Sequence, residues 1–397
     1  MSPITYADRF EGITGSAIRE IFKIISKPGM ISFAGGNPAE SALRVDWVND
    51  LVHDALAQNG KSILQYGATE GYPAFRESLL IYIQNTLGIK LQSNQVLPVT
   101  GSTQAMDLLC KALINPGDTI LVEDPTFLGN MQCMRLYQAK LVPVSVDENG
   151  IDLQRLEDVI KTAHPKILYV IPNFQNPTGC TLSLEKRRII SELAEKFDFI
   201  IAEDDPYRDL RYRGHTLPSI KSFDSSGHVA YMGSFSKIIS PGLRVGYLAA
   251  NEELIRKCTI GKQSSDLHTA NLTQAIVDLF LRKNLLPEHI MTICDHYREQ
   301  MTTMLAELNS FPYETRFTNP DGGLFIFVTL PDKICANTLL LKCIENNVAF
   351  VPGTHFYAYG EHENTLRLNF SSSTVEIIQI GIRILKKALI EMMEETP

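Results

Sequence analysis

The chain has 397 residues, of which 44% are hydrophobic and 21% charged, and its formal net charge is -8. A chain of this length and composition can bury a large core, and ordinary domain sizes suggest two domains. The acidic balance, without a basic tract, argues against a nucleic-acid partner, and no apolar run approaches the roughly 18 residues of a membrane span. Because the first residues, MSPITYADRFEG, lack a basic segment followed by an apolar core, we expect a cytoplasmic protein.

The amino-terminal part predicts helices and an extended arm. Apolar residues at helical spacing predict a helix over Ser16 to Ser26, which a Pro-Gly pair ends before the extended piece MISFAGGNP. This helix and the extended piece are expected to form the arm. A second amphipathic helix is expected over Val45 to Ala57, and LQYGATEGYPAFRESL follows as a loop before another helix.

From Gln95 onward, short β-rich runs alternate with helices, which predicts a parallel sheet with crossover helices. The run QVLPVTG leads into STQAMDLLCKALI, so Gly101, Ser102 and Thr103 lie where a strand turns into a helix. The exposed amides of a helix start attract a phosphate, and capping of the helix by Ser102 or Thr103 is compatible with that role.

Two acidic residues end a later predicted strand. In DFIIAEDDPY, Asp204 and Asp205 follow an apolar run, and ligands bind at this carboxyl edge in open α/β sheets. A pair of surface acids in a loop is the ordinary interpretation. The preceding strand, KILYVIPN, ends at QNPTG, which by itself reads as a turn.

The stretch Tyr231 to Ala250, YMGSFSKIISPGLRVGYLAA, carries the strongest candidate chemistry. Lys237 follows a buried strand among small hydroxylated residues, where a lysine loses its proton more easily and can form a Schiff base. Ser234, Ser236 and Arg244 provide two hydroxyl donors and a planar fork that can clamp a phosphate. An amine beside a phosphate clamp suggests pyridoxal phosphate. For S-x-S-K alone, an ordinary turn with a solvated lysine is the alternative.

The carboxyl-terminal part predicts a second, smaller unit. A mostly helical region is expected from Asn271 to Ser310, with a break near Pro287, followed by several strands and a final helix from Thr374 to Glu394. In LRLNFS, Arg367 alternates with apolar neighbours on a strand, where a charge needs an anion or an acid as its partner. An internal salt bridge is the ordinary interpretation.

The motif S-F-S-K-x-x-x-P-G-L-R-x-G resembles the cofactor-lysine segment of class I/II, fold type I pyridoxal phosphate aminotransferases, and the resemblance covers nearly the whole chain. It is closest to the branch of kynurenine/2-aminoadipate aminotransferases and MocR-type regulators. The resemblance implies an α/β fold, with a large domain built on a mostly parallel seven-stranded sheet and a smaller α+β domain. The expected division is 1–45 for the arm, which packs with the small domain, 46–285 for the large cofactor-binding domain and 286–397 for the small domain.

The resemblance also implies the catalytic roles. Lys237 holds the cofactor as a Schiff base and moves the substrate's α-proton. Asp204, which the D-x-P-Y spacing favours over Asp205, contacts the pyridine nitrogen. Asn176 and Tyr207 reach the cofactor's phenolate oxygen.

The remaining site residues follow from the same resemblance. Phe127 stacks on the pyridine ring, at a position where many relatives have tyrosine. The phosphate is held by Gly101, Ser102, Thr103, Ser234, Ser236, Arg244 and, from the neighbouring subunit of a homodimer, Tyr66. The substrate is bound by Arg367, which takes the α-carboxylate, and by Arg19, Gly36 and Asn176. By pattern alone, Arg19 is equally well a solvated helix charge, and Tyr66 a half-buried packing residue.

The expected activity is amino-group transfer from an α-amino acid, of the 2-aminoadipate, glutamate, leucine or aromatic type, to a 2-oxo acid such as 2-oxoglutarate, with ping-pong kinetics. The same residues could serve a β-lyase, racemase or decarboxylase. A non-catalytic MocR-type sensing domain is a further alternative, although no basic winged-helix module precedes the arm. Nine histidines without ligand spacing and seven cysteines without a C-x-x-C pair predict no metal site and no disulfide framework.

Overall fold

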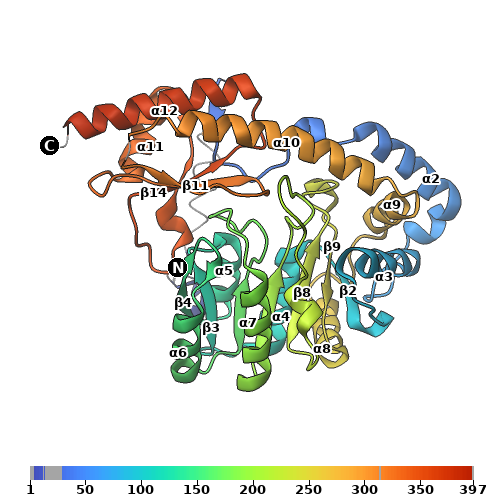
Figure 1. The fold of residues 1–397 in the computed structure, drawn as a ribbon. Coiled ribbons are helices and arrows are strands. Elements are labelled where there is room, and N and C mark those ends of the chain that lie inside the picture. The colour runs from blue at the N-terminus through green and yellow to red at the C-terminus, as the bar shows by residue number, and fades with distance from the viewer. Residues whose placement is uncertain (1–3, 12, 14–28, 313, 396–397) are drawn as a thin grey trace.

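The computed structural model describes residues 4–11, 13, 29–312 and 314–395. Figure 1 shows a large sheet with helices on both faces and, above it, a smaller sheet covered by long helices. The predicted helix over 16–26, with Arg19, lies outside the described residues.

The large sheet has eight strands. Its order is β2 (Val96–Val99), β9 (Gly246–Ala249), β8 (Val229–Ser234), β7 (Ile200–Asp204), β6 (Ile167–Val170), β3 (Thr119–Asp124), β4 (Lys140–Asp147) and β5 (Gly150–Ile151). The pairs from β8 to β4 are parallel, whereas β9 runs antiparallel to both neighbours and β5 antiparallel to β4. The predicted mostly parallel α/β sheet is confirmed, with one strand more than expected because the two-residue β5 extends the edge.

Helices cover both faces of this sheet, which explains its continuous apolar strands: both sides of β2, β6 and β9 are buried. These helices are α4 (Ser102–Leu113), α5 (Leu128–Leu136), α6 (Leu153–Ala163), α7 (Leu184–Phe197) and α8 (Glu252–Gln263). The start of α7 is fixed by Ser183, whose hydroxyl accepts a hydrogen bond from the Lys186 amide, as the sequence predicts.

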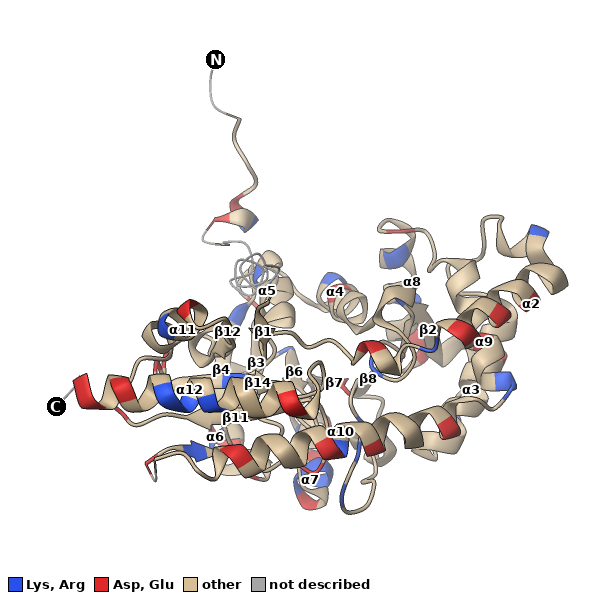
Figure 2. Ribbon diagram, turned by 90° about the horizontal axis from the view of Figure 1, so that it is seen from above, with Lys and Arg blue, Asp and Glu red and all other residues tan. Residues whose placement is uncertain are grey.

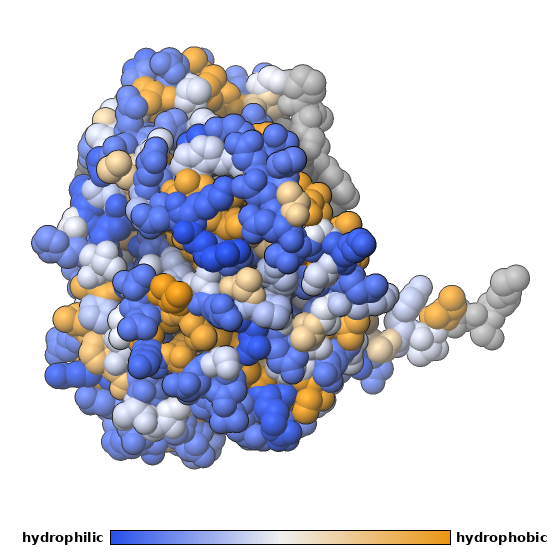
Figure 3. Space-filling model, turned by 90° about the vertical axis from the view of Figure 1, so that its right-hand side faces the viewer, coloured by the Kyte–Doolittle hydropathy of each residue, from blue (hydrophilic) through white to orange (hydrophobic). Residues whose placement is uncertain are grey.

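Three further helices, α2 (Val45–Ile63), α3 (Pro73–Leu87) and α9 (Asn271–Arg282), lie beside the sheet edge that carries β2. The next helix, α10 (Leu286–Leu308), leads from there toward the smaller sheet (Figure 1). The break between α9 and α10, with Pro287 in the first turn of α10, was predicted, whereas α2 runs six residues beyond its predicted end at Ala57. Figure 3 views the molecule from this side, where apolar patches lie between hydrophilic residues.

The smaller sheet is antiparallel, with the order β10 (Arg316–Phe317), β11 (Phe325–Thr329), β14 (Thr365–Asn369) and β13 (Val351–Pro352). Near it lie α10, α11 (Ala336–Glu345) and α12 (Val375–Glu395). Figure 2 shows mostly acidic residues along α10 and both acidic and basic residues along α12. The short strand β1 (Ile31–Ser32) pairs with β12 (Val348–Ala349), so the segment that leads to Gly36 is anchored to the carboxyl-terminal part. The domain boundaries themselves stay a prediction. Among the described residues, no helix combines the length and apolar character needed to cross a membrane.

Candidate active site

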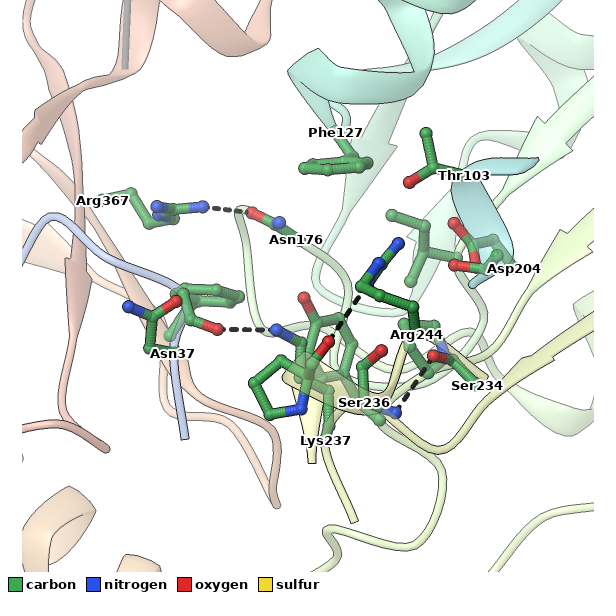
Figure 4. Close-up of a pocket in the computed structure, with 17 residues that line it drawn as sticks. Asn37, Thr103, Phe127, Asn176, Asp204, Ser234, Ser236, Lys237, Arg244 and Arg367 are labelled. Carbon is green, nitrogen blue, oxygen red and sulfur yellow. Dashed lines mark hydrogen bonds between the residues drawn. The ribbon is translucent and has the colours of Figure 1, made fainter. Parts of the chain in front are cut away.

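A cavity of about 290 Å³ lies where the carboxyl edge of the large sheet faces β11 and β14 of the smaller one (Figure 4). Its size is close to the lower end of the range for small-molecule sites. The candidate site residues that line it are Gly36, Ser102, Thr103, Phe127, Asn176, Asp204, Tyr207, Ser234, Ser236, Lys237, Arg244 and Arg367. Residues from widely separated stretches of the sequence therefore meet at one place.

Lys237 follows β8 and reaches into the cavity, where its Nζ donates a hydrogen bond of 2.8 Å to the carbonyl oxygen of Gly36. Burial, followed by the positive charges of Arg367 and Arg244, lowers the pKa of the amine to about 8. A substantial fraction of this amine is therefore neutral near pH 8, as a nucleophile or a general base requires.

The two adjacent acids differ in what they face. Asp204, the last residue of β7, lines the cavity, whereas both oxygens of Asp205 accept hydrogen bonds inside the protein, from Asn173 Nδ2 at 2.8 Å and from Tyr231 Oη at 3.1 Å. Burial raises the pKa of the Asp204 carboxyl to about 6, while hydrogen bonds, that from Tyr169 first, work against the rise. The D-x-P-Y spacing thus selects the acid that reaches the cavity.

The proposed phosphate side combines a helix start with hydroxyls and an arginine. Gly101, not Ser102 or Thr103, occupies the cap position of α4, and no side chain caps that end. Capping by Ser102 or Thr103, the alternative that the sequence left open, is not formed, because both residues lie in the first turn of the helix. Their uncapped amide groups and hydroxyls are beside the cavity, where the helix start favours an anion.

Arg244 closes this side of the cavity. Its guanidinium donates to the Thr100 carbonyl oxygen at 3.1 Å and lies so close to Gly101 that a Cβ there would come within 2.5 Å of Nη2. Glycine is therefore required at position 101 for two reasons: its φ of 83° and the close approach of the Arg244 guanidinium. Gly101 does not itself line the cavity. Arg244 adopts φ 55°, a conformation that costs a non-glycine residue about 1–2 kcal/mol. Beside it, the Ser234 hydroxyl accepts a hydrogen bond from the Ser236 amide at 3.2 Å.

Arg367 is buried on β14 at the opposite side of the cavity. Its Nη1 donates to Asn176 Oδ1 and its Nη2 to the Ala34 carbonyl oxygen, both at 2.7 Å, while its Nε has no partner. The guanidinium also lies over the Phe325 ring, 4.2 Å from its centroid. No carboxylate of the described residues pairs with it, so the salt bridge that the sequence left open is not formed. Burial lowers its pKa to about 10, which still leaves a positive charge at neutral pH.

Asn176, Tyr207 and Phe127 occupy the remaining walls. The Asn176 carbonyl group faces Arg367, which leaves its Nδ2 as the group available to donate. Burial raises the pKa of Tyr207 above its ordinary value, so its hydroxyl keeps its proton. Phe127 and Lys237 lie at opposite sides of the cavity in Figure 4.

Tyr66 does not reach the cavity of its own chain: it follows α2 and is 81% exposed, with its ring edge against His268. Other residues at the site were not predicted. Asn37, Ile171 and Phe325 line the cavity, and Asn130 and Tyr169 contact Asp204 from behind. Nothing in the local sequence marks them, because their contacts join segments far apart in the chain.

Fold and cavity together define a fold type I transferase. The class I and II aminotransferase family matches residues 28–385 of the chain. Aromatic-amino-acid aminotransferase 1 of Thermococcus litoralis is 37% identical over 98% of this chain and 95% of its own length. The solved structure of a multiple substrate aminotransferase from Thermococcus profundus is 36% identical, with a TM-score of 0.94 over 98% of both chains.

A third comparison bears on ligands. The α-aminoadipate aminotransferase of Thermus thermophilus, solved in complex with N-(5'-phosphopyridoxyl)-L-leucine, is 36% identical, with a TM-score of 0.90 and 98% of both chains covered. The chain belongs to the class I and II aminotransferases, and it is an enzyme of that family. The expected kinship to 2-aminoadipate aminotransferases is confirmed.

The residues present fit pyridoxal phosphate. One carboxylate oxygen of Asp204, Oδ1, is buried and has no hydrogen-bond partner. The nearby Ser102 hydroxyl favours the charged form of the carboxylate, but it does not meet hydrogen-bond geometry with Oδ1. The α4 start, with no side-chain cap, and Arg244 suit a phosphate, and an amine with a lowered pKa suits an aldehyde. Each chemical feature of that cofactor has a counterpart on the cavity wall.

Proposed function

We propose that this aminotransferase moves the amino group of an α-amino acid, of the 2-aminoadipate, glutamate, leucine or aromatic type, to a 2-oxo acid such as 2-oxoglutarate. The relatives support this range, since one acts on aromatic amino acids, one is described as a multiple substrate enzyme, and one carries a leucine adduct. The observation that carries the proposal is that Lys237, with its lowered pKa, shares a cavity with Arg367, a buried guanidinium that has no carboxylate partner among the described residues.

The cofactor is pyridoxal phosphate. When bound, it supplies an electron sink that stabilises the negative charge left on the substrate's α-carbon after that carbon loses a bond. Lys237 Nζ would hold it covalently and Asp204 would keep its ring nitrogen protonated. Asn176 Nδ2 and the Tyr207 hydroxyl would donate to its phenolate oxygen. Phe127 would pack on the ring, and the phosphate would be bound by Gly101, Ser102, Thr103, Ser234, Ser236 and Arg244, with Tyr66 from a second subunit.

Arg367 would bind the substrate's α-carboxylate. The guanidinium is held by two neutral oxygen atoms, so its charge is available to an incoming anion, and a buried charge pair with this geometry also fixes orientation. Gly36, whose carbonyl oxygen already holds Lys237 Nζ, and Asn176 would border the bound amino acid. Arg19 would meet an acidic side chain.

Lys237 would also move the proton. Once its Nζ is free, burial and two neighbouring guanidinium groups keep much of it neutral near pH 8, so it can take the proton from the substrate's α-carbon. Donor and acceptor would use the same Arg367 clamp in turn, which predicts ping-pong kinetics. The first product has to leave before the second substrate binds.

The wider setting is proposed on the same basis. The enzyme would be a cytoplasmic homodimer. Its sites would be composite, since Tyr66 is exposed on the single chain and would reach the site of the second subunit. Residues 46–285 would form the large domain, and 1–45 would pack with the small domain, 286–397. Its partners would be small molecules.

A panel of amino donors with 2-oxoglutarate tests the activity. We expect glutamate to form from 2-oxoglutarate, together with the oxo acid of each donor used, and parallel double-reciprocal plots. Borohydride reduction should fix the cofactor to Lys237, as mass spectrometry of the peptide can show. Ammonia released without the formation of glutamate would instead indicate a lyase, and a racemised donor would indicate a racemase.

A further inference from the structure

Three buried side chains from different elements form a closed hydrogen-bonded triangle behind the cavity. The hydroxyl of Tyr169, on β6, donates to Asp204 Oδ2 at 2.8 Å. Nδ2 of Asn130, on α5, donates both to the same oxygen at 3.0 Å and to the Tyr169 hydroxyl at 2.8 Å. All three residues are 3% exposed or less.

The two carboxylate oxygen atoms of Asp204 differ in their hydrogen bonding. Oδ2 accepts both hydrogen bonds, whereas Oδ1, equally buried, accepts none. A carboxylate held by two donors on one oxygen cannot rotate without losing both hydrogen bonds, which are strong because the acceptor is charged. The unpaired oxygen is therefore the one left for the cavity that Asp204 lines.

Toward Asp204 the Tyr169 hydroxyl is the donor, while it accepts a hydrogen bond from Asn130. Burial, followed by the negative charge of Asp204, raises the pKa of the phenol well above its ordinary value, so the proton stays on the tyrosine oxygen. Burial, and then the negative charge of Asp205, favour the protonated form of Asp204, whereas the side chains of Tyr169, Ser102 and Asn130 favour the carboxylate. Tyr169 and Asn130 thus act on both the orientation and the charge of the acid.

We propose that Tyr169 and Asn130 are positioning residues, which hold the Asp204 carboxylate ionised and direct its Oδ1 at the ring nitrogen of the cofactor. This inference rests on the proposed function, since it takes Asp204 as the partner of that nitrogen. Neither residue touches the cavity, so any effect on catalysis passes through Asp204.

The test compares two cofactors in one protein. Full-length protein, freed of cofactor, is titrated with pyridoxal phosphate and with 1-deazapyridoxal phosphate, in which a C–H group replaces the ring nitrogen. The native protein should prefer pyridoxal phosphate. In Tyr169→Phe the ratio of the two affinities should fall by about tenfold, the loss typical of a hydrogen bond to a charged group, and Asn130→Ala should also lower it. Because both affinities are measured on the same variant, partial loss of folded protein cancels.

Tyr231→Phe is the matched control. It also removes a buried tyrosine hydroxyl that donates to an aspartate, but the acceptor is Oδ2 of Asp205. It should leave the ratio at its native value. If Tyr169→Phe and Asn130→Ala weaken both cofactors by the same factor, the triangle is only structural and the inference is overturned. If the native protein binds the two cofactors equally well, the contact between Asp204 and the nitrogen is itself wrong, and the inference falls with that part of the proposed function.

Discussion

The side-chain amine of Lys237 donates a hydrogen bond of 2.8 Å to the backbone carbonyl oxygen of Gly36, a residue 201 positions earlier in the chain. Gly36 follows β1, which pairs with β12 of the carboxyl-terminal part, whereas Lys237 follows β8 of the large sheet. The amine is thus bound by one part of the molecule and carried by the other. Its chemistry depends on how those two parts bury it.

The buried amine should make stability depend on pH. Burial lowers the pKa of Lys237 from 10.5 to about 8, so between these pH values the unfolded chain binds the proton and the folded chain does not. The free energy of unfolding of the cofactor-free protein should therefore rise with pH across this window, by about 3 kcal/mol from this one group. Lys237→Met should lack that rise.

Urea denaturation of the native and Lys237→Met proteins at pH 7 and pH 10 measures this difference. At pH 7 the free energy of unfolding of Lys237→Met should be higher relative to the native protein than at pH 10, where most of this advantage should be lost. Other titrating groups are common to both proteins and cancel. A stability difference that does not change between the two pH values would show that the amine is not destabilised by burial.

The two adjacent acids should behave differently on substitution. Asp204→Ala should keep the protein folded and able to bind cofactor but lower the rate of transamination by about a hundredfold or more, as when one preorganised electrostatic contact is lost. Asp205→Ala should mainly lower the melting temperature, because it leaves Asn173 Nδ2 and the Tyr231 hydroxyl without their acceptor. Steady-state rates and thermal melts of both variants check this, and equal kinetic damage in Asp205→Ala would contradict the assignment.

Local motifs together with the family resemblance were enough to predict most of the cavity wall. Each motif, S-F-S-K, P-G-L-R or D-x-P-Y, spans only a few residues. The motifs follow strands whose ends the sheet brings to one edge. Asn130 and Tyr169 could not be predicted in this way, because what links them to the site is a hydrogen bond to Asp204, which lies 74 and 35 positions away in the sequence. The sequence left open whether Ser102 or Thr103 caps α4. Gly101 holds that position in the structure, where Arg244 lies too close for a side chain, and local preference does not contain this contact.

Tyr66 should act across a subunit interface. Because Tyr66 is exposed and does not line the cavity of its own chain, Tyr66→Ala and Lys237→Ala should complement each other in mixed dimers, where one of the two sites keeps both native residues. Random reassembly makes half of the dimers mixed, so about a quarter of the native activity should return. Activity after denaturation and refolding of an equal mixture measures this, with each variant refolded alone as the control. Verified mixed dimers without activity would place Tyr66 outside the site.

Loss of Arg367 should affect every amino donor to a similar extent. The α-carboxylate is common to all of them, so Arg367→Ala should lower kcat/KM for glutamate, leucine and aromatic donors alike, by about 2–5 kcal/mol. Arg211→Ala is a suitable control, because Arg211 also stacks on an aromatic ring, that of Phe174, but does not line the cavity. A loss confined to one class of donor would contradict a role at the α-carboxylate.

Arg19 should instead affect only donors with an acidic side chain. The residue lies outside the described part of the structure, and its assignment rests on the resemblance of the arm to that of related aminotransferases, in which the arm is mobile. Arg19→Ala should lower kcat/KM for glutamate and 2-aminoadipate much more than for leucine, because only the dicarboxylic donors lose a charged partner. The ratio of kcat/KM for glutamate and leucine, measured in the native protein, in Arg19→Ala and in Arg367→Ala, separates the two arginines. Arg367→Ala should leave that ratio nearly constant, whereas an unchanged ratio in Arg19→Ala would mean that Arg19 does not contact the substrate side chain.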